Sequence, residues 1–363
     1  MQHKLSQGKL LDENGNLFEA GYATELVKEY SRKDIKAGKL RIKEWDYYLI
    51  SDGEKAVALT LDDNSYMSMA SVSFLDFKKP GYITKSEIKF FSLGKLNFPS
   101  SYHDGDINYQ SKNVKGSFLK QGDKRILRFE YKKFDDKNKA NGDFACEFIL
   151  TDEPRDKMVI ATPFNKKGHF YYNAKINCMR AEGYARIGDT TYNFSKDNAL
   201  ATLDWGRGVW TYKNEWYWGS LQATLDDGKT FGFNIGYGFG DTSAASENMI
   251  FYDGVAHKLE DVSFNIPQKE NGKGFDYMKD WTFTDNLGRF NLTFKPVIDR
   301  FDNTDLIVLG SCQHQVFGLL SGEVVLDDGT KVEFTRNGEW KELDCRKGEV
   351  PAALVPAEIN KAV

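Results

Sequence analysis

The chain has 363 residues, of which 40% are hydrophobic and 14% aromatic, and its formal net charge is −4. This composition excludes a predominantly disordered chain, and the length predicts about two domains. Lys and Arg are scattered along the sequence rather than gathered in a basic stripe, so we expect no nucleic-acid partner.

Residues 1–15 lack the apolar stretch of a signal peptide, and the chain has no run of about 18 apolar residues. We therefore expect a cytoplasmic protein without a transmembrane segment. The four cysteines have no CxxC spacing and predict free thiols rather than zinc ligands or disulfides: Cys146, Cys178, Cys312 and Cys345. The histidines show no metal-binding spacing, so we expect neither a metal nor a cofactor.

Residues 23–38 are the best helical candidate, because Leu26 and Tyr30 stand four positions apart. From residue 39 onward the dominant period is two. Apolar and polar residues alternate on both sides of Asp52-Gly53, which predicts a hairpin. Similar turn signals predict many short antiparallel strands, because their residues tolerate positive φ: Gln121-Gly122-Asp123, Asp227-Gly228, Asp253-Gly254 and Asp328-Gly329.

A polar segment at 151–170, with Pro154 and Pro163, interrupts the strand pattern. We place a domain boundary there. The predicted fold is all-β, with two antiparallel β-barrel or curved β-sandwich domains packed together and few helices. An N-terminal β domain would span 1–160 after a short helical or irregular leader, and a C-terminal β domain would span 161–363 and end in a polar tail.

The segment 203–220, LDWGRGVWTYKNEWYWGS, places four Trp among few charges. If Asp227-Gly228 forms a two-residue turn, Trp216 faces Phe239 and Trp218 faces Tyr237, on one side of the sheet. That side would be aromatic, and the other would carry mostly small residues. Such a face is either an ordinary core or the wall of a ligand cavity.

Asp204 and Arg207 lie on opposite sides of an extended strand, so a pair between them would need a bend at Gly206. Arg207 could instead stack on Trp205 or Trp210 and bond to the backbone. In the alternative interpretation, Asp204 is a carboxyl group in an aromatic pocket whose proton is retained by desolvation, ready to act as a general acid.

The segments LDWGRGVWTYKNEWYWGS, GFNIGYGFGDTSAASENMIFYDGVAHKL and HQVFGLLSGEVVLDDG resemble the bacterial domain-of-unknown-function family 2804 over almost the whole chain. That family is in turn similar to two-domain lipocalin-like proteins, which include carotenoid 1,2-hydratase and tocopherol cyclase. The resemblance implies that a small hydrophobic, terpenoid-like or lipid-like molecule binds in a β-barrel cavity. Such a molecule could then be hydrated, isomerised or cyclised by protonation of a double bond.

On this interpretation the first candidate for the acid is Asp204, with Glu215 and Glu247 as alternates, and His314 would orient a carboxyl group or water. The candidate ligand-binding residues are Trp205, Arg207, Trp210, Trp216, Trp218, Tyr237 and Asn248. Structural roles are the alternative for His314, Glu247 and Asn248. A non-catalytic carrier or sensor remains open, and so does a glycan-binding or glycan-cleaving protein, which would need two carboxyl groups about 5–9 Å apart across a groove.

Overall fold

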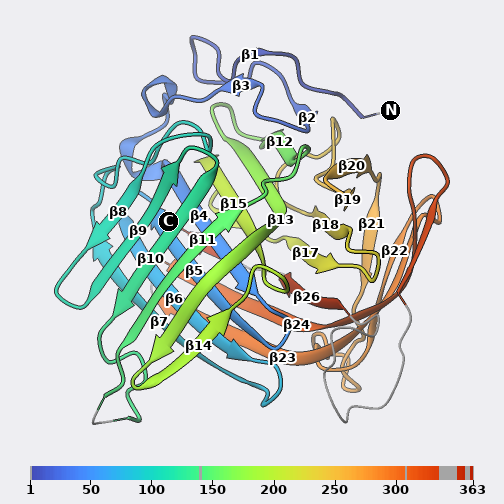
Figure 1. Cartoon of the computed structure of the whole chain (residues 1–363). Helices are drawn as coiled ribbons and strands as arrows, with labels where there is room; N and C mark the ends of the chain where they lie inside the picture. Colours follow the sequence, from blue (N-terminus) through green and yellow to red (C-terminus); the bar gives the residue numbers. More distant parts are fainter. Residues whose placement is uncertain (1, 139–140, 307–308, 335–349, 356–359, 363) are drawn as a thin grey trace.

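The computed structural model describes residues 2–138, 141–306, 309–334, 350–355 and 360–362, and these residues form an almost entirely β protein. Two large antiparallel sheets lie against each other, and the first is curled into an incomplete barrel (Figure 1). The predicted all-β fold with two curved antiparallel units is confirmed.

The first sheet runs in the order β7-β6-β5-β4-β15-β13-β11-β10-β9-β8, with β12, β14 and β2 attached beside it. Its strands among the described residues are β2 (Gly21–Ala23), β4 (Lys43–Ser51), β5 (Lys55–Asp63), β6 (Met67–Asp76), β7 (Gly81–Phe90), β8 (Ile107–Gln110), β9 (Val114–Gln121), β10 (Lys124–Tyr131), β11 (Phe144–Thr151), β12 (Met158–Pro163), β13 (Phe170–Ile187), β14 (Thr190–Phe194) and β15 (Leu200–Val209).

The second sheet runs in the order β20-β19-β18-β17-β26-β24-β23-β22-β21. Its described strands are β16 (Lys213–Asn214), β17 (Tyr217–Thr224), β18 (Thr230–Tyr237), β19 (Met249–Tyr252), β20 (Val255–Lys258), β21 (Val262–Asn265), β22 (Trp281–Asp285), β23 (Phe290–Leu306), β24 (Leu309–Val325), β25 (Lys331–Phe334), β26 (Val350–Val355) and β27 (Asn360–Ala362). The chain changes sheet between Val209 and Lys213, whereas the predicted boundary lies at 151–170. Strand β12 lies within that boundary segment, and β12, β13, β14 and β15 all belong to the first sheet.

The N-terminal segment lies across one end of the molecule (Figure 1). It contains the parallel pair β1 (Gly8–Lys9) and β3 (Lys28–Glu29) and the short 3₁₀ helices η1 (Arg32–Asp34) and η2 (Lys39–Arg41). The prediction of a helix at residues 23–38 is therefore wrong. Tyr30 and Ile35 are buried in the core of the first sheet, so tertiary packing rather than a helical period accounts for the apolar residues of this segment.

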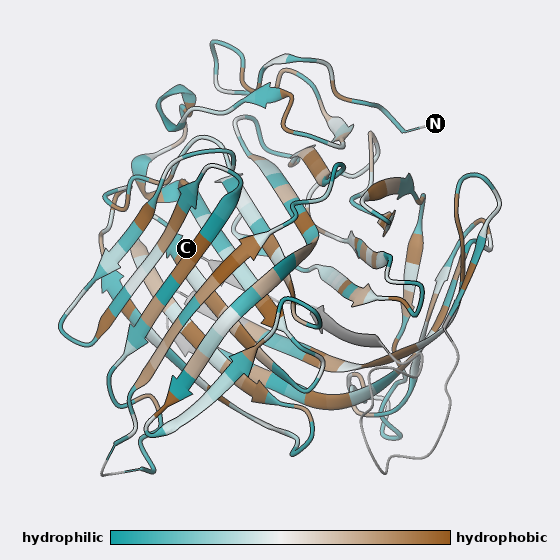
Figure 2. Ribbon diagram, viewed as in Figure 1, coloured by the Kyte–Doolittle hydropathy of each residue, from teal (hydrophilic) through white to brown (hydrophobic). Residues whose placement is uncertain are grey.

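The predicted turns at Asp52-Gly53, Gln121-Gly122, Asp253-Gly254 and Asp328-Gly329 each join two antiparallel strands. Hydropathy alternates along many of these strands, as Figure 2 shows. The first sheet encloses a core of buried aliphatic and aromatic side chains. A second core is formed by the second sheet and includes residues of β17 and β18. Fully buried rings of the two cores include Trp205, Phe129, Phe148, Tyr172, Phe231 and Trp281.

The register predicted for the β17–β18 hairpin is wrong by one residue. Leu225 N donates to Lys229 O, so the loop has three residues and closes with Gly228 at a φ of +83°. Trp218 consequently faces Gly236, and Tyr217 faces Tyr237. The predicted aromatic side does not form: Tyr217 and Tyr237 pack against the second core, whereas Trp218 lies on the opposite side with mostly small or polar residues.

A bulge in β13 fixes the contact between the sheets. The register with β15 shifts between Ile176 and Met179, and Cys178 takes a φ of +64°. A Cβ on Gly232 of β18 would lie 2.7 Å from Cys178 Sγ, so only glycine allows this approach. Asn177 Nδ2 donates to Ser220 Oγ (2.8 Å) across the same contact. The sheets therefore meet through β13, β17 and β18, and they meet again where β4, β5 and β6 pack against β23 and β24.

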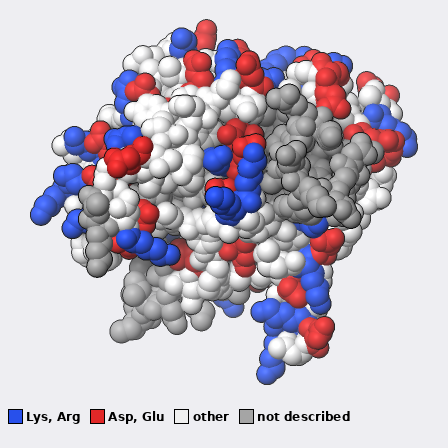
Figure 3. Space-filling model, turned by 60° about the horizontal axis from the view of Figure 1, so that its bottom comes forward, with Lys and Arg blue, Asp and Glu red and all other residues white. Residues whose placement is uncertain are grey.

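Three cysteines, Cys146, Cys178 and Cys312, are free thiols as predicted, and Cys345 lies outside the described residues. No helix in the described part of the chain is long and apolar enough to cross a membrane. Lys and Arg are interspersed with Asp and Glu over the face drawn in Figure 3.

Candidate functional site between the two sheets

The segment 203–220 carries the chain from one sheet to the other, and its two ends meet again through Lys175. β15 contributes Asp204, and β17 contributes Trp218. Lys175 Nζ of β13 lies 2.6 Å from Asp204 Oδ2 and 4.5 Å from the centroid of the Trp218 ring. One ammonium group thus joins a carboxylate of the first sheet to an aromatic ring of the second.

Asp204 is held as a carboxylate acceptor. Asn173 Nδ2 donates to its Oδ1 (2.8 Å), while Lys175 approaches Oδ2. Both Asn173 and Lys175 are buried, whereas the Asp204 side chain keeps 13% exposure. Both oxygens of Asp204 are therefore engaged by side chains of β13.

Glu247 approaches the same group from the second sheet. Asn234 Nδ2 donates to Glu247 Oε2 (2.9 Å), and Trp218 Nε1 donates to Asn234 Oδ1 (2.7 Å). We call Lys175, Asp204, Trp218, Asn234 and Glu247 the inter-sheet site. Glu247 and Asp204 are partly exposed although the site lies between the sheets, so solvent reaches it.

Two features of β18 and its neighbours position Glu247. A Cβ on Gly236 would lie 2.6 Å from Glu247 Oε1, so the carboxyl group occupies the space that a side chain would fill. Asn248 accepts a hydrogen bond from Gly236 N (2.7 Å) and donates to Glu260 O (2.6 Å). Asn248 is buried, and these bonds fit a positioning role.

The inter-sheet site holds two carboxyl groups beside Lys175, and the ammonium of Lys258 also acts on Glu247. Burial raises the pKa of Glu247 above its ordinary value of 4.5, and the neighbouring Asp204 raises it further. Lys175 and the Asn234 hydrogen bond act in the opposite direction without cancelling the rise. Glu247 is therefore the carboxyl group of this site that retains a proton most readily.

Aromatic rings from both sheets border the inter-sheet site, and the Phe239 ring contacts three of them. Its ring centroid lies 4.8 Å from that of Tyr171, 5.0 Å from that of Trp216 and 5.6 Å from that of Trp210. Trp45 stacks on Tyr171 at 5.7 Å. Burial raises the pKa of Tyr171, and the negative charges of Asp204 and Glu247 raise it further. We call Trp45, Tyr171, Trp210, Trp216 and Phe239 the aromatic wall.

Sequence reasoning missed several members of this arrangement. Lys175 and Asn173 lie in FYYNAKINCM, a run that reads as a buried strand, and a Lys and an Asn within such a run could have indicated a polar site. Tyr47 packs edge-on against Trp218 at 6.4 Å and accepts a hydrogen bond from Gln315 of β24. Nothing in the sequence links these distant positions.

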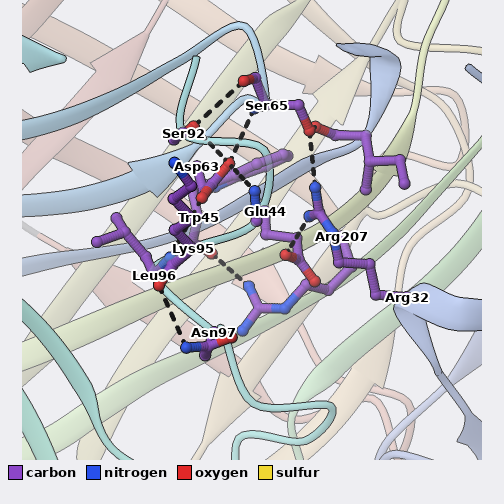
Figure 4. Close-up of polar contacts among 12 residues, drawn as sticks. Arg32, Glu44, Trp45, Asp63, Ser65, Ser92, Lys95, Leu96, Asn97 and Arg207 are labelled. Carbon is purple, nitrogen blue, oxygen red and sulfur yellow. Dashed lines mark hydrogen bonds and ion pairs between the residues drawn. The ribbon is translucent and has the colours of Figure 1, made fainter. Parts of the chain in front are cut away.

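Arg207 and Trp205 lie on the other face of β15, inside the first sheet. Arg207 pairs with Asp46 (3.0 Å), donates to the backbone oxygen of Trp45 and covers the Trp205 ring at 4.2 Å. Its partner is thus Asp46, and β15 stays in register with β4 through Gly206. Gly206 is instead required by packing, because a Cβ at this position would lie 2.0 Å from the Trp45 ring. Figure 4 shows Arg207 beside Trp45.

His314, Tyr237 and Glu215 are placed apart from the inter-sheet site. Gln315 faces the first sheet, so the neighbouring His314 faces the second core, where Nδ1 lies 2.8 Å from Asp299 Oδ2 and the ring stacks on Tyr277 at 4.0 Å. Tyr237 stacks on Tyr217, and Glu215 is exposed. Among the described residues, no group of three or more His, Cys, Asp or Glu is placed to hold a metal ion.

Comparison with known proteins identifies the family. The family model described as "Domain of unknown function (DUF2804)" matches residues 2–347. The chain belongs to this family. Among curated proteins, none matches the chain significantly.

Solved structures show the fold that this DUF2804 chain shares. A candidate AttH from Nitrosomonas europaea is 12% identical with a TM-score of 0.51, over 94% of this chain and 99% of that one. Kievitone hydratase from Nectria haematococca is 9% identical (TM-score 0.45, covering 99% and 97%). CghA, solved with Sch210972, is 8% identical (TM-score 0.48, covering 98% of each chain). The similarity to the Nitrosomonas europaea protein shows a shared fold and does not assign an activity.

Proposed function

We propose that this protein binds a small unsaturated lipophilic molecule, terpenoid-like or lipid-like, against the aromatic wall. Glu247 donates a proton to a double bond of that molecule. The observation that carries the proposal is a carboxyl group with a raised pKa beside Tyr171 and Trp218, at a site that solvent reaches. Because buried rings fill the interior of the first sheet, we place the ligand between the sheets rather than inside a barrel.

Different residues of the inter-sheet site take part in different steps of the proposed reaction. The proton moves from the Glu247 carboxyl group to one carbon of the double bond, and the other carbon becomes cationic. The carboxylates of Asp204 and of the deprotonated Glu247 stabilise that cation through their negative charge. In a hydration, a water oxygen bonds to the cation, and the proton that the water releases restores Glu247. In an isomerisation, the cation instead returns a proton from a neighbouring carbon to Glu247. In a cyclisation, a second double bond of the molecule first bonds to the cation, and the new cation then loses a proton to Glu247, with no net addition.

Lys175 and Asp204 act as positioning residues. The ammonium of Lys175 holds Asp204 in place, and the negative charge of Asp204 raises the pKa of Glu247. The Asp204–Lys175 pair also offers a polar anchor for an oxygen substituent of the ligand. Roles for Trp205 and Arg207 in ligand contact do not form part of the proposal, since both are fully buried inside the first sheet.

Deuterium oxide gives a direct test. The purified protein is incubated in D₂O with a total lipid extract of its host, and bound and free lipids are identified by mass spectrometry. We expect a lipophile to bind to the wild type and to gain deuterium at carbon. Glu247→Gln should still bind it but should incorporate deuterium at least about a hundredfold more slowly, the usual contribution of a general acid.

Glu215→Gln serves as the matched control, because Glu215 is exposed, and it should behave like the wild type. Incorporation by Glu247→Gln at the wild-type rate would exclude Glu247 as the acid. Binding without incorporation by the wild type would indicate a carrier or sensor instead. Repeated failure to retain any lipophile would overturn both the catalytic and the carrier proposals.

A further inference from the structure

An exposed apolar surface lies at the edge of the first sheet, away from the residues of the inter-sheet site. Phe90, Phe91 and Leu93 are 66%, 64% and 46% exposed, and Ile88 is exposed beside them. In the ladder, Ile88 pairs with Met69 and Phe90 pairs with Met67, so apolar side chains continue onto the outer face of β6. We call residues 88–93 the apolar edge.

The fold holds this apolar edge in place with a buried carboxylate. Asp63 Oδ1 accepts hydrogen bonds from Ser92 Oγ (2.7 Å), Gly94 N (3.1 Å) and Ser65 N (2.9 Å), as Figure 4 shows for Ser92 and Ser65. Asp63 is fully buried. The anchor therefore lies directly under the exposed loop.

The backbone of the loop takes conformations that residues with a Cβ rarely adopt. The φ angles are +58° at Phe91 and +54° at Leu93, and Ser65 below them has +67°. Phe91 N donates to Tyr66 O, and Leu93 N donates to Ser65 O, which keeps both residues at the surface. The fold therefore holds two exposed apolar residues in strained backbone conformations. This indicates that it keeps them at the surface, where a partner can contact them.

A basic segment is attached to the same place. Ser65 Oγ donates to Ile42 O (2.6 Å) and accepts from Arg32 Nη2 (2.7 Å), so residues 32–41 lie beside the loop. A Cβ on Gly94 would lie 2.6 Å from Arg32 Nε. Exposed side chains of this basic segment and of the loop are Lys33, Asp34, Lys36, Lys39, Leu40 and Lys95, of which four are basic and one is acidic.

We infer that the apolar edge and the basic segment together bind the surface of a bilayer that contains anionic lipids. Aromatic and aliphatic side chains at a fixed tip insert at the level of the headgroups, and flanking lysines are attracted to anionic headgroups. A polar protein partner would fit this surface poorly, because the exposed rings of Phe90 and Phe91 would stay in water. This inference stands apart from the proposed function, since it uses no residue of the inter-sheet site.

Vesicle sedimentation tests it with the full chain. We expect the wild type to sediment with vesicles of phosphatidylcholine and phosphatidylglycerol, and added salt should weaken this binding. Phe91→Ser combined with Leu93→Ser should weaken it by about tenfold or more for each residue replaced, the effect of withdrawing one large apolar side chain. Leu287→Ser is the matched control, because Leu287 is 56% exposed on a different turn.

Equal thermal unfolding of the variants shows that the fold is intact. Absence of wild-type sedimentation, or unchanged sedimentation of the double variant, would overturn the inference. Equal binding to pure phosphatidylcholine would overturn the part assigned to the basic segment. A dimer in solution that the double variant dissociates would show that a second copy, rather than a bilayer, covers the surface. Glu247→Gln should sediment like the wild type whatever its catalytic defect.

Discussion

Strand β15 carries a charged side chain on each of its faces, and the two have different surroundings. Arg207, on the inner face, is fully buried and meets one carboxylate, Asp46, together with backbone oxygens and the Trp205 ring. Asp204, on the outer face, shares Lys175 with a second carboxyl group, Glu247. The inner pair is enclosed, whereas the outer group holds two carboxyl groups that are partly exposed to solvent.

This difference separates a structural ion pair from a candidate reactive site. In the inner pair, burial raises the pKa of Asp46, and the charge and hydrogen bond of Arg207 oppose that rise without cancelling it. In the outer group, burial likewise raises the pKa of Glu247, but this carboxyl group is partly exposed to solvent. Both arrangements arise within four residues of the sequence, so the amino-acid types alone do not distinguish them.

The largest effect is expected from breaking the inner pair. Asp46→Ala leaves a fully buried guanidinium without its carboxylate, which should lower the free energy of unfolding by about 3–5 kcal/mol. Urea unfolding followed by tryptophan fluorescence measures the change. Glu54→Ala, which removes a partner of Lys78 at the surface, is the control and should cost at most about 1 kcal/mol. Equal losses would contradict the assignment.

A smaller loss is expected from the outer group. Lys175→Met leaves Asp204 and Glu247 without their shared cation, but Asp204 keeps contact with solvent, so we expect a loss of about 2 kcal/mol at neutral pH. Replacing Asp204 by Leu in the same chain should restore most of it, because the uncompensated charge is then removed. A double variant that is no more stable than Lys175→Met would show that packing, not charge, decides this effect.

The smallest effect is a pH dependence. Because burial raises the pKa of Glu247, the folded protein keeps a proton that the unfolded chain releases above about pH 4.5. The stability contributed by this group is therefore complete below that pH and is lost as the pH rises through the pKa of the folded state. The difference in unfolding free energy between Glu247→Gln and the wild type should grow in favour of the variant over this range.

Denaturant titrations across that pH range measure the difference, and taking the variant as reference cancels the other buried carboxyl groups. A difference that stays flat with pH would mean that Glu247 titrates normally in the folded protein, which would remove the main support for its role as an acid.

Much of the fold could be predicted because its causes are local. The turn at Asp253-Gly254 adopts positive φ at both residues, as its composition predicts, and the strands alternate in hydropathy. The turn at Asp227-Gly228 shows the limit: one more residue in the loop shifted the register and moved Trp218 to the opposite side of the sheet from Tyr237. A short motif identifies a hairpin but does not fix which side chains share a face.

The sequence by itself determined an all-β chain, the positions of its hairpins and the DUF2804 resemblance, because strand period and turn chemistry act between neighbouring residues. Only the tertiary structure decided that Lys175 and Glu247, 72 positions apart in the numbering, meet at Asp204 and Trp218. The reason is that the β13 bulge and the glycines of β18 set how the two sheets approach, and the pKa of Glu247 depends on that approach.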